Sequence, residues 1–281
     1  MSLAALRDTI DSLTQSPVLW VPGLVCGVLA AALWLVLIQT GTFFASRLLV
    51  IFSMFALLFI IGILAAIKKN TNTVRGMIAN GVSYYFNVLV PTLIIVFSIV
   101  IIFILVVLTL GLLGMKLEEG AGLFTFLSFG VVLPTVVLTF FYDTAVVFDE
   151  KKVFESLGRS IEVVTMHLGE VFLFFAGCLL ILVSISFAFM VVWTALLADR
   201  LEPITRYTQT QNQSFTPDHL IGMIGSDGVW ITALVIFWYM TFLIPILYTY
   251  KACFYRLIAV KTVPVQQQFG EYDSKGRWYK Y

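Results

Sequence analysis

Charged residues are scarce in this sequence: Asp, Glu, Lys and Arg make up 12% of it, against roughly 25% in soluble domains. Apolar residues make up 60%, and the mean hydropathy is +0.99. No polar stretch is long enough to fold as a large soluble domain. The composition therefore predicts an integral membrane protein, so any function is carried within the membrane or at its surfaces.

Several kinds of functional site are also missing. The net charge of +1 provides no basic field, which excludes nucleic acid as the expected partner. Cys26, Cys178 and Cys253 show no paired spacing, so neither a disulfide framework nor a zinc site is indicated. His167 has no second His or Cys at ligand spacing and is expected to lie at the surface or at a helix end. Phosphate loops, Ser-x-x-Lys and His-Glu-x-x-His motifs are absent. We therefore predict no catalytic residue, no metal and no cofactor.

Long apolar runs dominate the chain. A run of about 20 apolar residues is long enough to cross a hydrocarbon core of roughly 30 Å. The sequence predicts an all-α protein with six transmembrane helices, at about 18–37, 48–67, 89–113, 123–142, 171–196 and 229–250. Residues 1–260 are expected to form one bundle, and residues 261–281 a basic, aromatic cytoplasmic tail.

Two features of the spans bear on packing. Gly23, Gly27 and Ala31 recur at every fourth position of the first span, a ridge of small residues that lets another helix approach closely. We expect this ridge to serve packing within the chain rather than a dimer. Pro91 is placed in the first turn of the third span, where a missing N–H costs least. Pro134 lies inside the fourth span and predicts a kink.

Three segments between or before the spans have the periodicity of amphipathic helices: residues 1–17, 74–85 and 153–168. Asn72 or Thr73 is expected to cap the second segment. In the third, Phe154, Leu157, Ile161, Val164 and Leu168 share one face. Glu155 precedes Arg159 by four residues, which predicts an ion pair, and Asp149 with Glu150 is expected to provide the N-cap and an acidic first turn. Next to membrane spans, such helices are expected to lie in the cytoplasmic interface.

The distribution of basic residues sets the orientation. On the predicted topology, only four of the 17 lysines and arginines lie on one side, namely Arg47, Lys116, Arg200 and Arg206. The other side carries both termini and the two linkers with amphipathic helices. The positive-inside rule places that richer side in the cytoplasm. We therefore expect a multi-pass protein of the plasma membrane with cytoplasmic N- and C-termini.

The linker at residues 146–172, VVFDEKKVFESLGRSIEVVTMHLGEVF, combines an acid-rich turn, SLGRS on an amphipathic helix and immediate entry into a span. In this it resembles polytopic prokaryotic membrane proteins of unknown function, including archaeal families, and the membrane domain found beside some glycerophosphodiester phosphodiesterases. The N-terminal helix that ends at Pro17 is similar too, so the likeness covers residues 1 to about 260. It implies a six-span bundle in the cytoplasmic membrane. It supplies no catalytic residues, because in such fusions the phosphodiesterase chemistry sits in a separate soluble domain.

Asp143 is the most notable ionisable residue, because the sequence YDTAVVF continues the apolar run of the fourth span. Buried acids in membranes are functional or paired. One interpretation is a proton or cation site, or a contact for a basic substrate group. The other, which we favour, is an ion pair with Arg159, Arg75 or a lysine at the cytoplasmic rim. The candidate polar site at this rim consists of Asp143, Arg159, Arg75, Glu155 and Glu162.

Two classes of function remain open. The first is a non-catalytic membrane protein that scaffolds or regulates a partner through its cytoplasmic amphipathic helices or the tail KGRWYKY. The second is a transporter or lipid-handling protein with a head-group or proton site near Asp143. Membrane lipids are expected partners in both. The first is preferred because the spans are almost wholly apolar, whereas transport normally needs polar residues within them. Asn212 lies in an Asn-x-Ser sequon and is a candidate glycosylation site.

Overall fold

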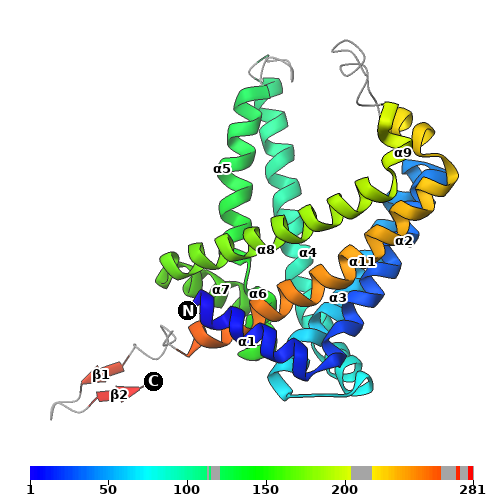
Figure 1. Ribbon diagram of the computed structural model, residues 1–281. Coiled ribbons are helices and arrows are strands. Elements are labelled where there is room, and N and C mark those ends of the chain that lie inside the picture. Colours follow the sequence, from blue (N-terminus) through cyan, green and yellow to red (C-terminus); the bar gives the residue numbers. More distant parts are fainter. Residues whose placement is uncertain (113, 115–120, 204–216, 261–269, 273–277, 281) are drawn as a thin grey trace. The chain divides into compact units, whose positions relative to one another are not determined.

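The computed structural model describes residues 1–112, 114, 121–203, 217–260, 270–272 and 278–280, and almost all of these are helical (Figure 1). Six helical stretches are long and apolar enough to cross a membrane: Pro17–Thr40, Thr42–Lys69, Val74–Leu112, Phe129–Phe148, Leu168–Leu196 and His219–Ala259. The prediction of a helical chain with six such stretches is confirmed. These stretches point to a multi-pass membrane protein.

In chain order the described elements are α1 (Ser2–Gln15), η1 (Pro17–Trp20), α2 (Val21–Thr40), α3 (Thr42–Lys69), α4 (Val74–Leu112), α5 (Ala121–Thr139), α6 (Tyr142–Phe148), α7 (Val153–Met166), α8 (Leu168–Leu196), α9 (Ala198–Leu201), α11 (Pro217–Ala259), β1 (Gly270–Tyr272) and β2 (Trp278–Lys280). The two strands lie within the predicted tail. They pair antiparallel, with Glu271 opposite Tyr279.

Helix boundaries differ from the predicted spans in two places. The second amphipathic segment and the third span form one helix of 39 residues, α4, so Pro91 lies inside this helix and the first-turn placement is wrong. The fourth span ends early: α5 stops at Thr139, and the short helix α6 follows after a break at Phe140 and Phe141. Hydropathy marks where apolar residues begin and end, whereas a helix continues through any residues that tolerate its dihedral angles.

The chain divides into two compact units. The first comprises Met1–Asp8, Val82–Phe174 and Lys251–Tyr281, and the second Thr9–Gly81 and Phe175–Tyr250. The division falls inside α1, α4, α8 and α11, so each of these helices contributes residues to both units. The prediction of a single bundle over residues 1–260 stays a prediction.

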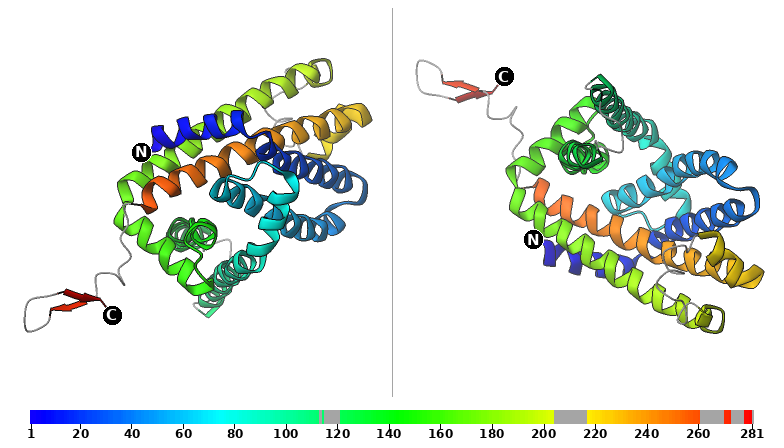
Figure 2. Two further views of the ribbon diagram at one scale, coloured as in Figure 1. Left: turned by 90° about the horizontal axis from the view of Figure 1, so that it is seen from below. Right: turned by 90° about the horizontal axis from the view of Figure 1, so that it is seen from above.

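The second unit contains a hairpin of α2 and α3, which lie side by side (Figure 2). Gly41 joins them with a φ of 77°, a conformation that only glycine adopts at little cost. Gly23 and Gly27 of α2 pack against α11: a Cβ on Gly27 would lie 2.5 Å from the Phe237 carbonyl oxygen, and one on Gly23 would overlap that of Thr241. In the described structure this small-residue ridge therefore faces another helix of the same chain.

The turn between α3 and α4 ends one helix at Asn70 and starts the next at Thr73. Asn70 closes α3 in the left-handed conformation, with a φ of 50°. Thr73 Oγ1 accepts a hydrogen bond of 3.2 Å from the backbone N–H of Gly76, so the predicted cap of the second amphipathic segment is confirmed at Thr73.

The first unit is built around aromatic side chains. Phe174 of α8 and Phe254 of α11 stack with ring centroids 4.5 Å apart, and Phe141 contacts both rings. All three side chains are fully buried. Around this core the unit packs α5 and α6 against α7. The polar groups described next lie beside these rings.

Candidate functional site: a buried ion-pair cluster

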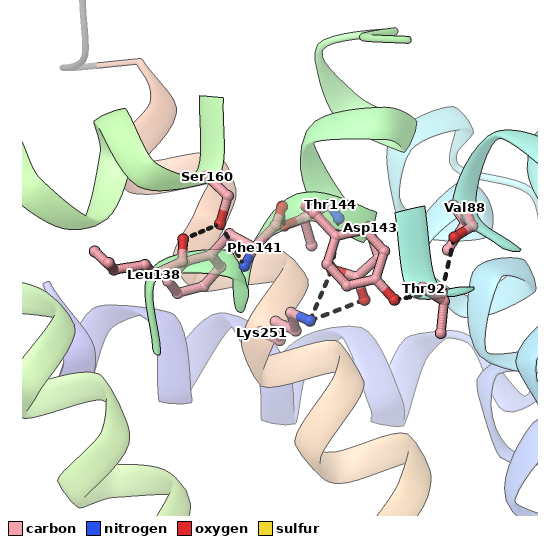
Figure 3. Close-up of polar contacts among 9 residues, drawn as sticks. Val88, Thr92, Leu138, Phe141, Asp143, Thr144, Ser160 and Lys251 are labelled. Carbon is pink, nitrogen blue, oxygen red and sulfur yellow. Dashed lines mark hydrogen bonds and ion pairs between the residues drawn. The ribbon is translucent and has the colours of Figure 1, made fainter. Parts of the chain in front are cut away.

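Asp143 lies in the first turn of α6 and points toward Lys251 of α11 (Figure 3). The Lys251 Nζ atom is 2.7 Å from Asp143 Oδ1 and 2.8 Å from Oδ2, so the ammonium contacts both carboxylate oxygens. Asp143 is 5% exposed and Lys251 6%. Both residues belong to apolar stretches of membrane-spanning length. The favoured interpretation pairs Asp143 with Arg159, Arg75 or an unspecified lysine at the cytoplasmic rim; the structure pairs it with Lys251.

Neighbouring groups support this pair. The backbone N–H of Thr144 donates to Asp143 Oδ1 at 2.7 Å, and the Lys251 ammonium lies 4.2 Å from the centre of the Phe140 ring. A buried charge is tolerated when it is paired and its remaining hydrogen-bonding capacity is used. Removal of one partner from such a pair leaves the other charge buried and alone, which typically costs about 3–5 kcal/mol.

A second group of charges surrounds Arg159 on α7. Its Nε atom donates to Asp149 Oδ2 at 2.9 Å, and its Nη1 atom donates to Glu162 Oε2 at 2.8 Å. The hydroxyl of Tyr255 donates to the same Asp149 oxygen at 2.7 Å. Burial disfavours the charged guanidinium, but the hydrogen bonds to Glu162 and Asp149 outweigh it, and the pKa of Arg159 is raised from its ordinary value. Arg159 is therefore a fixed positive charge between two carboxylates.

Both groups attach the end of α11. Lys251 and Tyr255 are four residues apart, which places them on the same face of this helix. Lys251 binds α6 through Asp143, and Tyr255 binds Asp149, the residue that ends α6. Through Asp149 and Arg159 the attachment extends to α7. One face of α11 is thus fastened to both short helices of the first unit.

Side-chain hydroxyl groups form hydrogen bonds with backbone groups at the break between α5 and α6. Ser160 Oγ accepts a hydrogen bond of 3.0 Å from the Phe141 N–H and donates one of 2.8 Å to the Leu138 carbonyl oxygen (Figure 3). Two backbone groups released by the break are satisfied in this way. Thr92 of α4 donates to the Val88 carbonyl oxygen at 2.7 Å and lies 2.7 Å from the Tyr142 hydroxyl. A threonine hydroxyl has one hydrogen, so Tyr142 is the donor in this contact.

Of the other predicted site residues, Glu162 belongs to the buried cluster, whereas Glu155 and Arg75 are exposed. Glu162 binds Arg159, as described above. Glu155 is exposed, and Arg159 pairs with Asp149 and Glu162, so the predicted Glu155–Arg159 pair is wrong: Arg159 lies on the packed side of α7 and Glu155 on the open side. Arg75 is exposed and belongs to the second unit. Asn212 lies outside the described residues.

The predicted start of α7 is also wrong. Its N-cap position is Lys152, without a side-chain cap, rather than Asp149 or Glu150. Asp149 instead ends α6, where its carboxylate accepts hydrogen bonds from Arg159 and Tyr255. Glu150 follows with a φ of 54°, a left-handed conformation that breaks the helix.

Three members of the cluster were missed by sequence reasoning: Lys251, Tyr255 and the carboxylate role of Asp149. The predicted sixth span ends at Tyr250, which leaves Lys251 in the tail, whereas α11 continues to Ala259. A signal was present in the motif YKACFY, where Lys251 and Tyr255 share a face within an apolar sequence. A lysine in such a place needs a carboxylate partner, and Asp143 was the obvious candidate.

The buried and exposed side chains of α7 do not follow its predicted polar and apolar faces. Its buried side chains include Ser156, Arg159 and Ser160, which pack inside the first unit. Phe154, on the apolar face, is 75% exposed, and Ile161 is 41% exposed. The packed side of α7 thus combines these polar residues with Val163 and Val164, while Phe154 and Ile161 are left open to the surroundings.

The cluster can hold helices together: Lys251 pairs with Asp143, and Arg159 pairs with both Asp149 and Glu162, so two cations face three carboxylates. Within the described part of the chain, no three His, Cys, Asp or Glu side chains are grouped so as to hold a metal ion. His167 is half-buried and ends α7, the helix-end position expected for it.

Comparison with protein families gives one match: residues 2–258 fit the family described as "Domain of unknown function (DUF7847)". Comparison with curated proteins and with solved structures gave no match.

Proposed function

We propose that this chain, which belongs to the DUF7847 family, is a non-catalytic membrane protein that scaffolds or regulates a partner at the plasma membrane. The observation that carries the proposal is the pairing of the buried charges. Asp143, the most notable ionisable residue in the sequence, forms an ion pair with Lys251 and accepts a hydrogen bond from the backbone N–H of Thr144. A group engaged in this way supports the fold rather than a reaction.

The proposed placement in the membrane puts both termini and α7 on the cytoplasmic side. The excess of Lys and Arg on that side supports it. The exposed apolar face of α7 supports an interfacial position, because Phe154 and Ile161 would enter the acyl boundary while Arg159 stays inside the protein. Parts of α7 and of the tail that remain in water would then be available to a protein partner.

The resemblance to prokaryotic, including archaeal, membrane proteins enters the proposal as well. In some of these proteins, the membrane domain is fused to a soluble glycerophosphodiester phosphodiesterase domain. If this chain has such a partner, the catalytic groups belong to the partner, and the six apolar helices provide its attachment to the membrane.

A transporter or lipid-handling protein is the second candidate. It is favoured by one observation: Asp143 and Lys251 form an ion pair within apolar stretches of membrane-spanning length. Ionisable residues at such depth often belong to ion or proton pathways. In that case the pair would open during transport, and a head group or proton would bind Asp143.

One variant separates the two candidates. Asp143→Asn keeps the shape of the side chain but leaves Lys251 without a carboxylate. Under the scaffold proposal, the melting temperature in detergent falls, and proteoliposomes of the wild type and the variant show the same absence of proton- or cation-coupled flux. Under the transport proposal, the wild type shows such a flux and the variant loses it. A wild-type flux that is lost in a stably folded Asp143→Asn protein would overturn the scaffold proposal.

A further inference from the structure

An apolar groove lies between α2 and α11 in the second unit. Its volume is about 560 Å³, within the range of roughly 300–1,000 Å³ usual for ligand pockets. Its lining includes Val28, Ala31 and Leu35 from α2 and Trp230, Leu234 and Phe237 from α11. Its walls are almost entirely apolar, which suits a hydrocarbon chain.

The groove opens where the two helices move apart. At Gly23 and Gly27, α11 lies so close that an added Cβ would meet its backbone. Ala31 is the next residue of the same ridge, yet it lines the groove. The two helices are thus in close contact at the glycines, and the groove begins at Ala31 on the side that leads to Trp230, where Trp34 of α2 still donates a hydrogen bond of 3.2 Å to the Val229 carbonyl oxygen of α11.

Two opposite charges, Arg200 and Asp227, lie near Trp230 and outside the groove lining. Asp227 precedes Trp230 by three residues on α11, so it continues the groove-lining side of this helix. The Arg200 Nη2 atom of α9 lies 3.7 Å from Asp227 Oδ2, which is too long for a hydrogen bond. Trp230 itself is 63% exposed, and tryptophan is enriched at membrane interfaces. A guanidinium beside a carboxylate complements the phosphate and the ammonium of a zwitterionic head group.

We infer that the groove binds a phospholipid whose head group carries a primary ammonium. One acyl chain lies against Ala31 and Leu234, the phosphate binds Arg200, and the ammonium binds Asp227. Arginine suits phosphate because its fork of donors matches two phosphate oxygens. A primary ammonium has N–H donors for the carboxylate, which a quaternary ammonium lacks. This inference uses residues of the second unit only and stands apart from the function proposed above.

The test is native mass spectrometry of the full chain released from nanodiscs that contain equal amounts of phosphatidylethanolamine, phosphatidylcholine and phosphatidylglycerol. The wild type should retain phosphatidylethanolamine in preference to the other two lipids. Ala31→Leu fills the groove and should lower the retained fraction about tenfold, equivalent to about 1.4 kcal/mol. Ala188→Leu makes the same change on an exposed position of α8 and should leave retention unchanged. Ala32→Leu, also in the groove lining, replaces Ala31→Leu if a melt shows that the latter is unfolded.

The head-group contacts have their own variants. Asp227→Asn should abolish the preference for phosphatidylethanolamine over phosphatidylcholine, and Arg200→Gln should reduce retention of all three lipids. Equal retention by the groove-filling variant and Ala188→Leu would overturn the site. A wild-type preference for phosphatidylglycerol would overturn the head-group assignment. A lipid-free dimer that Ala31→Leu dissociates would show that a second copy of the chain fills the groove instead.

Discussion

Lys251 and Arg159 are long basic side chains that are almost completely enclosed by protein. Each is accommodated because carboxylates lie at 2.7–2.9 Å, and the apolar rings nearby exclude water that would otherwise compete for the charges. In such surroundings a pair contributes little net stability compared with apolar residues, but the loss of one partner is costly. The cluster is therefore sensitive to single substitutions.

Arg159 offers a direct comparison with an exposed arginine. Arg159→Ala leaves Asp149 and Glu162 without their shared cation and should lower the free energy of unfolding by about 3–5 kcal/mol. Arg256→Ala is the control: its pair with Asp8 is 3.6 Å long and partly exposed, and should be worth about 0.2–1 kcal/mol. Chemical unfolding in mild detergent measures both, and equal losses would contradict the assignment of Arg159 to the buried cluster.

The effect of Arg159 should not depend on pH in the ordinary range. Its pKa is raised in the folded protein, so the stabilisation is present at every pH below the already high unfolded value and is lost only above it. The difference in unfolding free energy between wild type and Arg159→Ala should therefore show no step between pH 7 and 9.

At the scale of the helix, α7 shows what an amphipathic pattern does and does not reveal. The spacing of Phe154, Leu157 and Ile161 predicts a helix, and α7 is one. The pattern cannot tell which face packs against protein, because in a membrane an apolar face can equally contact lipid. Here the serines and Arg159 are buried, while Phe154 and Ile161 are open.

Substitutions on the two faces of α7 test its contact with the membrane. Ile161→Asp or Leu157→Asp removes an apolar side chain worth on the order of 1–2 kcal/mol when it is withdrawn from water and places a charge there. Both changes should lower the melting temperature in lipid nanodiscs far more than Glu155→Ala, which alters an exposed polar position. If the melts of the three variants coincide, α7 does not contact lipid through this face.

The sequence predicts six long apolar helices because hydropathy over about 20 residues is a strong signal. It predicts helix ends less well: α4 starts 15 residues before the expected third span at Leu89, since residues 74–88 favour the same helical conformation. Asp143 could be singled out by its apolar surroundings. The only sequence signal for its partner is the apolar context of Lys251 in YKACFY, because Lys251 is 108 residues away and sequence gives no distances between helices.

For the whole molecule, the basic residues predict its direction in the membrane. Four basic residues lie on one side of the predicted topology, and the other 13 of the 17 lie opposite. By the positive-inside rule, the side with 13 basic residues is expected to face the cytoplasm.

Cysteine labelling tests the direction. Single cysteines at Thr208 and Ser274, in a variant whose native cysteines are replaced, should be reached by a membrane-impermeant thiol reagent from opposite sides, with position 208 outside. Labelling of both positions from one side of intact cells or spheroplasts would contradict the topology.

The central claim is that Asp143 and Lys251 act as a structural pair, and a double-mutant cycle tests it most directly. Unfolding free energies are measured for Asp143→Asn, Lys251→Met and the double variant. Each single change should cost about 3–5 kcal/mol, because it leaves one charge buried and alone, and the double variant should cost much less than the sum. Small losses that simply add would contradict the claim, because they would mean that the two residues do not depend on one another.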